Sequence, residues 1–161
     1  MRRSWRSGYT LVELLVVLAV LAVLASAAMP LAQMTRQREQ ERELRRALWE
    51  IRDALDGWRR AREAGAIVPG PGEGASLYPP NLLALVQPTP DARRDRAGAV
   101  LRFLRQVPRD PFADSSLPAW RTWGLRSWKS EADAPRAGAE VYDVYSLSPR
   151  LGLNGVPLRQ W

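Results

Sequence analysis

Residue types that could do chemistry are scarce in this sequence. The chain has 161 residues and contains neither cysteine nor histidine. This composition excludes disulfide frameworks, thiolate metal sites, cysteine nucleophiles and histidine-based catalytic triads. The carboxylate pairs Asp110/Asp114 and Glu131/Asp133 lie in turn-rich segments, where solvation explains them better than acid–base catalysis does. The sequence therefore predicts a protein that is not an enzyme, with no catalytic and no metal-binding residues.

Glu13 is the most informative carboxylate because it lies at the edge of a long apolar run. Residues 14–35 carry no charge, and as a helix they are long enough to span ~30 Å of hydrocarbon. An unpaired carboxylate drawn toward the bilayer centre costs ~2.5 kcal/mol or more. The partner that would neutralise it at least cost is a free α-amino group, so Glu13 is a candidate functional residue.

The residues before the apolar run indicate its orientation in a membrane. Arg2, Arg3 and Arg6 precede it without any acidic residue, which by the positive-inside bias predicts a cytoplasmic N-terminus and an extracytoplasmic body. An ordinary secretory signal peptide that ends in the small residues 25–27 is the alternative interpretation. Glu13 argues against it, since a disposable signal gains nothing from a carboxylate there.

The apolar pattern continues as an amphipathic helix beyond the membrane segment. Pro30 removes one backbone donor and predicts a local break or kink between the two halves, and the helix is expected to end near Gly65. Favourable i,i+4 pairs are expected at Glu41/Arg45 and Asp56/Arg60. The core-facing stripe consists of Leu44, Leu48, Ile51, Leu55 and Trp58, for which core packing is favoured over a basic nucleic-acid-binding helix.

The rest of the chain predicts short elements and an antiparallel sheet. The net charge of +7 is spread along the chain, which makes nucleic acid an unlikely partner, although interleaved Trp and Arg could form a base-stacking platform. The glycines of the first loop lack the ending of a phosphate-binding loop. The expected elements are a loop over 65–74, a short helix entered through Pro80 and Asn81, a second helix over 91–106, and paired strands over 120–128 and 140–147.

The run Gly8-Tyr9-Thr10-Leu11-Val12-Glu13 and the apolar residues after it resemble the class III signal of the type IV pilin family, which includes the pseudopilins of type II secretion. The resemblance implies cleavage by prepilin peptidase between Gly8 and Tyr9, and N-methylation of Tyr9. It also implies that Glu13, as the fifth mature residue, neutralises the N-terminal amine of a neighbouring subunit during filament assembly. Pro30 matches the helix-perturbing proline common in pilins.

Later segments resemble the major pseudopilin group, with a divergent C-terminal loop. Related proteins bind calcium in that loop through oxygens that include aspartates, whereas residues 148–159 here contain no acid and two arginines, Arg150 and Arg159. Calcium prefers carboxylates among its ligands, so the calcium site is expected to be lost and no cofactor is expected. The loop is instead expected to be held by Pro149, Pro157, Leu151, Leu153 and Trp161.

The resemblance implies an α+β, pilin-like fold, with a long N-terminal membrane-spanning helix packed on a small antiparallel β-sheet. The expected parts are a leader over 1–8, a transmembrane and filament-core helix over 9–34, its amphipathic half over 35–65, and a periplasmic globular part over 66–161.

The implied function is that of a type II secretion pseudopilin. It would be a single-pass protein of the bacterial inner membrane, with its N-terminus cytoplasmic and its C-terminal domain periplasmic. It would assemble with other pseudopilins on an inner-membrane platform into a short filament that drives export. The alternatives are a type IV pilus subunit, including a minor pilin, for adhesion, motility or DNA uptake, and a membrane-anchored periplasmic binding protein. The absence of the cysteine pair usual in pilus subunits favours secretion.

Overall fold

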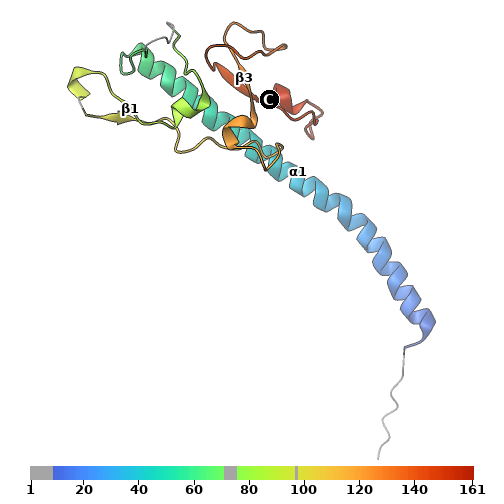
Figure 1. Ribbon diagram of the computed structural model, residues 1–161. Helices are drawn as coiled ribbons and strands as arrows, with labels where there is room; N and C mark the ends of the chain where they lie inside the picture. The colour runs from blue at the N-terminus through green and yellow to red at the C-terminus, as the bar shows by residue number, and fades with distance from the viewer. Residues whose placement is uncertain (1–8, 71–75, 97) are drawn as a thin grey trace, which may run out of the picture. The chain divides into compact units, whose positions relative to one another are not determined.

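The structure is a computed structural model that describes residues 9–70, 76–96 and 98–161, apart from the side chains of residues 27–31. Compact packing divides the chain into two units, residues 1–39 and residues 40–161. One long helix, α1 (Leu11–Glu63), contributes to both; it is the blue-to-green helix of Figure 1.

The first half of α1 is not amphipathic, because apolar residues lie on all of its sides. Every residue from 11 to 26 is exposed, and Leu11 is 76% accessible to solvent. Among the residues that the structure describes, no helix offers a stretch both long and apolar enough to cross a membrane.

The second half of α1 supplies one wall of the core, as its apolar period predicts. Leu44, Leu48, Ile51, Leu55 and Trp58 are all buried. They pack with residues contributed by the segments that follow α1, which are Ile67, Leu82, Leu85, Leu104, Val107, Trp123, Val141, Val144 and Leu158.

The end of α1 is set by a glycine. Gly65 adopts a positive φ of 68°, a conformation that glycine reaches without steric cost. The Ala66 amide donates to the Ala61 carbonyl at 2.8 Å and the Gly65 amide donates to the Arg62 carbonyl at 3.1 Å, which is the Schellman pattern of a helix C-terminus. The predicted end near Gly65 is confirmed.

The short helix predicted at Pro80 and Asn81 is present as a single 3₁₀ turn, η1 (Leu82–Leu85). The Asn81 side-chain oxygen accepts from the Ala84 amide at 3.0 Å and so caps the turn. Leu82 and Leu85 point into the core.

The helix predicted over 91–106 is wrong. The segment instead belongs to a hairpin in which β1 (Thr89–Pro90) pairs antiparallel with β2 (Val100–Leu101), and η2 (Arg94–Arg96) lies at its tip. The Asp91 amide donates to the Ala99 carbonyl at 2.9 Å. The Asp91 carboxylate also accepts from the Arg93 amide at 3.1 Å, and such local bonds compete with helix formation.

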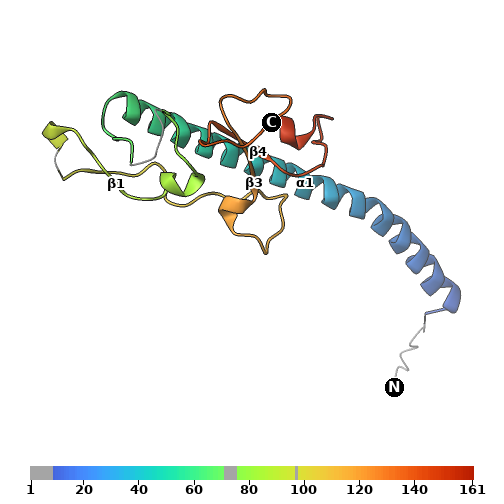
Figure 2. The same ribbon diagram turned by 45° about the horizontal axis from the view of Figure 1, so that its top comes forward.

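The predicted antiparallel strands are confirmed, and they are shorter than expected. β3 (Trp123–Arg126) pairs with β4 (Asp143–Ser146), with Gly124 opposite Tyr145. A Cβ at Gly124 would lie 2.3 Å from the Tyr145 ring, so the close approach requires glycine. Ahead of β3 lies η3 (Ala119–Arg121). In Figure 1 and Figure 2 these strands lie alongside the second half of α1.

The fold is thus α+β and pilin-like, with a long N-terminal helix packed against small antiparallel sheets. One correction concerns the sheet, because β1–β2 and β3–β4 form two separate two-stranded sheets.

The C-terminal loop is anchored differently from the prediction. Leu151 and Leu153 are 58% and 47% exposed, whereas Leu158, at the start of η4 (Leu158–Gln160), is buried. The expectation of apolar anchoring by Leu151 and Leu153 was wrong. A carboxylate of α1 holds the loop instead, since Glu41 Oε1 accepts from the Leu153 amide at 2.7 Å.

Candidate functional site

The start of α1 brings Tyr9, Thr10 and Glu13 into one turn. The Thr10 hydroxyl oxygen accepts from the Glu13 amide at 3.2 Å, and the Thr10 carbonyl accepts from the Leu14 amide at 3.2 Å. Thr10 therefore acts as the N-cap, with Glu13 three residues later as in a capping box. Gly8, the other side of the predicted cleavage site, lies outside the described residues.

The helix start gives Glu13 a favourable place for a carboxylate. It lies in the first turn of α1, where the positive end of the helix dipole stabilises negative charge. Its side chain is exposed, and Tyr9 beside it is 82% exposed. A new N-terminus at Tyr9 would thus stand one helical turn from Glu13, with both groups accessible to another molecule.

Glu13 is the only charged residue between Leu11 and Thr35. The exposed side chains around it are mostly leucine, valine and alanine on all sides of the helix. A helix that is apolar all round is normally covered by protein or by lipid. This half of α1 therefore presents a carboxylate at the end of an apolar cylinder.

The break predicted at Pro30 stays a prediction. Helix α1 runs from Leu11 to Glu63 without interruption, while the side chain of Pro30 lies outside the described residues. A proline in a helix interior removes one backbone hydrogen bond, which remains the reason to expect a local perturbation.

A second polar cluster, which sequence reasoning missed, joins α1 to the end of the chain. Arg52 Nε donates to Asp143 at 2.9 Å, and Arg52 Nη2 donates to the Trp161 carbonyl at 2.8 Å. Arg126 donates to the other Asp143 oxygen at 3.0 Å, and the Arg45 guanidinium lies 4.4 Å from the centre of the Trp161 ring. These contacts are structural, because Arg45 and Arg52 hold the last residue and β4 against α1, and Arg126 of β3 pairs with Asp143 of β4.

The ion pairs on α1 differ in part from the predicted ones. Arg60 lies 3.9 Å from Asp53, whereas the expected partner was Asp56. Arg59 pairs with Glu63 at 3.2 Å. These pairs are exposed, so they contribute little to stability.

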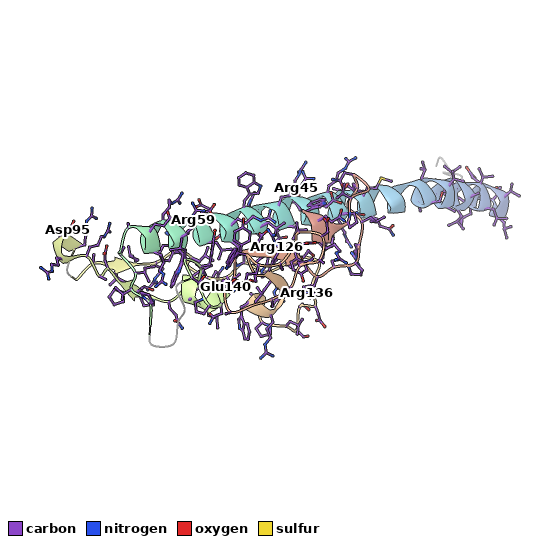
Figure 3. The ribbon with its side chains drawn as sticks, turned by 90° about the horizontal axis from the view of Figure 1, so that it is seen from above. Arg45, Arg59, Asp95, Arg126, Arg136 and Glu140 are labelled. Atoms are coloured by element: carbon purple, nitrogen blue, oxygen red, sulfur yellow. The ribbon has the colours of Figure 1, made fainter. Side chains whose placement is uncertain are left out.

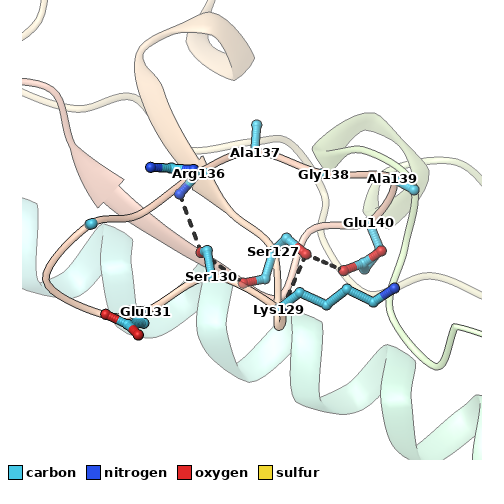
Figure 4. A pocket seen from close by; sticks show the side chains of 10 residues that line it. Ser127, Lys129, Ser130, Glu131, Arg136, Ala137, Gly138, Ala139 and Glu140 are labelled. Atoms are coloured by element: carbon cyan, nitrogen blue, oxygen red, sulfur yellow. Dashed lines mark hydrogen bonds between the residues drawn. The ribbon is translucent and has the colours of Figure 1, made fainter.

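An open cavity of about 570 Å³ lies inside the loop between β3 and β4. Ser127 Oγ donates to Glu140 at 2.5 Å, and the Ser130 hydroxyl donates to the Ser127 carbonyl at 3.0 Å. Figure 4 shows these bonds and the bond from the Arg136 amide to Ser130, at 3.2 Å. The polar groups bond one another across the loop, as expected of a folded loop that supports β3 and β4.

Two carboxylates have structural roles. Asp110 was expected to be solvated, which is wrong, because it is fully buried and accepts from Ser146 Oγ at 2.5 Å and from the Phe112 amide at 2.8 Å. Asp91 accepts from Arg93, and this hydrogen bond lowers the pKa of Asp91 to about 2. Within the described ranges, no group of three or more acidic residues could hold a metal ion.

Comparison with known proteins identifies one feature. Residues 6–29 match the prokaryotic N-terminal methylation motif, which is typical of the type IV pilin and pseudopilin family. No curated protein and no solved structure is detectably similar to the chain. The motif implies processing by prepilin peptidase and pilin-like assembly, and proteins that carry it are generally structural. It also suggests anchoring in the inner membrane.

Proposed function

We propose that this protein is a structural pseudopilin of a type II secretion system. Prepilin peptidase cleaves it between Gly8 and Tyr9, the new amine of Tyr9 is methylated, and the mature chain assembles with other pseudopilins into a short periplasmic filament. The observation that carries the proposal is the coincidence of the methylation motif over 6–29 with the capped start of α1 at Thr10.

The exposed apolar half of α1 supports storage in a membrane followed by assembly. Residues 14–35 carry no charge, and their described side chains are not covered by the rest of the chain. Exposed apolar area of this size is unfavourable in water by about 25 cal/mol per Å². Lipid covers it in the stored monomer, and neighbouring α1 helices cover it in the filament.

Glu13 makes assembly specific. In the stored monomer it lies near the membrane interface, where its charge is tolerated. In the filament it pairs with the N-terminal amine of a neighbouring subunit, because an unpaired carboxylate among apolar helices is costly. This requirement fixes the axial position of each subunit relative to its neighbour.

Secretion is favoured over a pilus by two features of the sequence. The chain lacks the cysteine pair usual in pilus subunits, and its later segments resemble the major pseudopilins. The periplasmic part, residues 66–161, must therefore rely on packing and hydrogen bonds rather than on disulfides for its stability.

Two measurements test the proposal in the native host. Intact mass and N-terminal sequencing should give a methylated Tyr9 as the first residue; an N-terminus at Ala28 would show an ordinary signal peptide instead. Glu13→Ala should leave cleavage and membrane insertion intact and abolish or slow filament assembly. The matched control is Glu50→Ala, which removes an exposed carboxylate from the other half of α1 and should assemble normally.

Deletion of the gene and the Glu13→Ala variant together separate the three candidate functions. Deletion of the gene should block export of a secreted protein if the filament serves secretion. Long surface filaments in the parent strain, and loss of adhesion, motility or DNA uptake in the deletion strain, would indicate a pilus. A membrane-anchored binding protein would form no filament, and Glu13→Ala would then have no effect on its state of association.

A further inference from the structure

The last segment of the chain folds into a small hairpin braced by its own backbone. The Gly152 amide donates to the Val156 carbonyl at 2.9 Å, and the Leu158 amide donates to the Arg150 carbonyl at 3.0 Å. An antiparallel bridge lies between these two hydrogen bonds. We call residues 150–158 the C-terminal hairpin. Because these bonds fix its shape, the side chains at its surface are held in a defined direction.

One side of the C-terminal hairpin is apolar and exposed. Leu151 and Leu153 are 58% and 47% exposed, whereas Gly152 between them is buried. A Cβ at Gly152 would lie 2.5 Å from the Trp161 ring. Successive side chains of an extended segment alternate in direction, so the two leucines point away from the surface that carries Trp161. They form the apolar tip of the hairpin, with Val156, 37% exposed, at its rim.

The C-terminal hairpin contacts α1 where this helix enters the unit formed by residues 40–161. The Leu153 amide donates to Glu41 Oε1 at 2.7 Å, and Glu41 is the second residue of that unit. Figure 3 shows Arg45, one turn later on α1, beside the C-terminal segment. The hairpin therefore lies at the end of the unit from which the chain leads back to the uncharged residues 14–35.

The excess positive charge of residues 9–161 is gathered in the two segments that this contact joins. Residues 36–46 of α1 contain five arginines and three glutamates, and residues 148–159 contain two arginines and no acid. The long stretch between them, 47–147, is nearly balanced, with fourteen basic and thirteen acidic residues. The apolar tip is thus accompanied by the basic surplus of the chain, which favours a partner with negative charge.

The length of chain between the apolar run and this contact matches the depth of lipid headgroups. Residues 14–35 carry no charge, and Arg36 is the first charged residue after them. The five helical residues from Arg36 to Glu41 span ~7.5 Å, and even fully extended they reach no more than ~18 Å. The polar region of a bilayer is ~5–7.5 Å thick on each side of the hydrocarbon core. The hairpin is therefore tethered within reach of the headgroups.

We propose that the C-terminal hairpin binds the surface of an anionic lipid bilayer. Leu151 and Leu153 enter the interface between headgroups and acyl chains, and the neighbouring arginines attract the lipid phosphates. Binding of such surfaces increases with the apolar area that they bury and with attraction to anionic lipids. The proposal rests on the proposed function, which stores the chain in a membrane through α1.

The tether makes a small contact sufficient. The apolar half of α1 already holds the chain in the membrane, so binding of the hairpin is an intramolecular event with a high effective concentration. The unit formed by residues 40–161 then rests on the membrane in one orientation and detaches when the subunit is extracted into a filament. A second copy of the chain fits this surface less well, because it would bring the same basic segments and repel.

Fluorescence quenching tests the contact in the full-length chain, which has no native cysteine. Val156→Cys, which leaves both leucines in place, is labelled with an environment-sensitive dye in vesicles of phosphatidylcholine and phosphatidylglycerol that carry a nitroxide on the headgroup. Asp95→Cys is the matched control, because Figure 3 shows Asp95 and Arg45 at opposite ends of the unit. We expect several-fold more quenching at position 156 than at position 95. Equal quenching at the two positions would overturn the proposal.

Substitution of the leucines tests which groups make the contact. Leu151→Ser/Leu153→Ser in the labelled chain should abolish the extra quenching, with the melting temperature confirming the fold. The matched control, Leu83→Ser/Leu117→Ser, replaces two leucines of other segments that are each 40% exposed and should keep it. Extra quenching that survives loss of the hairpin leucines would overturn the apolar contact, and equal quenching in phosphatidylcholine alone would overturn the selection of anionic lipid.

Two further readouts separate the occupants and the proposals. Extra quenching that disappears when the chain is diluted in lipid would indicate a second copy at the hairpin and overturn the lipid contact. A dye at Ala22→Cys, in the apolar half of α1, reports insertion through nitroxides on the acyl chains. Quenching at position 22 without extra quenching at position 156 would overturn the hairpin contact and leave membrane storage intact. Quenching at both positions in a chain that builds no filament in its host would overturn the pseudopilin role and retain the contact.

Discussion

The two halves of α1 differ in burial although both are rich in leucine. Residues 14–25 are apolar on every side, and all of them are exposed. In the second half, by contrast, Leu44, Leu48, Ile51 and Leu55 form one stripe, and each is at most 2% exposed. The difference shows the effect of periodicity: the chain's own later segments cover the single stripe, whereas they leave the helix that is apolar on all sides exposed.

The largest expected effect on stability comes from creating a cavity in the buried leucine and isoleucine stripe. Ile51→Ala should lower the free energy of unfolding of residues 40–161 by about 2–5 kcal/mol, since Ile51 is completely buried. Leu18→Ala, in the exposed half, should leave it unchanged. Urea unfolding of the full-length chain in detergent, followed by tryptophan fluorescence, measures both. Equal losses for the two variants would show that the halves are not independent.

A smaller effect is expected from the polar link between α1 and the C-terminal loop. Glu41→Ala removes the carboxylate that accepts from the Leu153 amide, and a hydrogen bond to a charged group contributes about 1.5–3 kcal/mol. Glu41→Gln keeps an acceptor oxygen and should lose less. The same unfolding assay checks both variants, and identical behaviour of the two would mean that the hydrogen bond is not what anchors the loop.

Low pH should destabilise the unit formed by residues 40–161, partly through protonation of Asp91. Its pKa is lowered from 3.8 to about 2, chiefly by the hydrogen bond from Arg93. A lowered folded-state pKa adds stability above the ordinary pKa, and this stability is lost as the pH falls through the folded value. The unfolding midpoint should therefore decrease between pH 4 and pH 2, and Asp91→Asn should flatten part of that decrease. If the unfolding midpoint of Asp91→Asn decreased with pH as steeply as that of the parent, Asp91 would not be a source of the acid sensitivity.

Calcium should have no effect at all. Residues 148–159 contain no carboxylate, and calcium sites in proteins usually include several. Millimolar calcium should leave the melting temperature of the full-length chain unchanged within error. A rise of several degrees that EGTA reverses would reveal ligands elsewhere in the chain.

The sequence predicted well the features that depend on near neighbours. Gly65 ended α1 because a left-handed residue and two nearby amides are sufficient to close a helix. Asn81 capped η1 for the same kind of local reason. Strand-length aromatic and β-branched runs predicted β3 and β4, and their pairing follows from the connecting loop.

Sequence-based prediction failed where hydrogen bonds to distant or competing groups outweighed local helix propensity. Residues 91–106 contain helix-forming arginines and leucines, yet the Phe103 and Leu104 amides both donate to the Leu85 carbonyl. That bond and the β1–β2 ladder hold the segment extended. Asp110 was misread for a related reason, since its partner Ser146 is far away in the chain.

For the candidate site, the sequence by itself determined the signal-like run at Gly8–Glu13 and the lone charge of Glu13, because these depend on residue types within one or two turns; the cap at Thr10 was seen only in the structure. Only the tertiary structure decided that Glu41 holds Leu153, that Arg52 holds Asp143 and the Trp161 carbonyl, and that Trp49 stays exposed. Such contacts join groups whose separation in the chain carries no signal. They arise when the folded chain brings donors and acceptors together around α1, and Trp49 stays exposed beside Arg45 and Arg52, which line the same pocket.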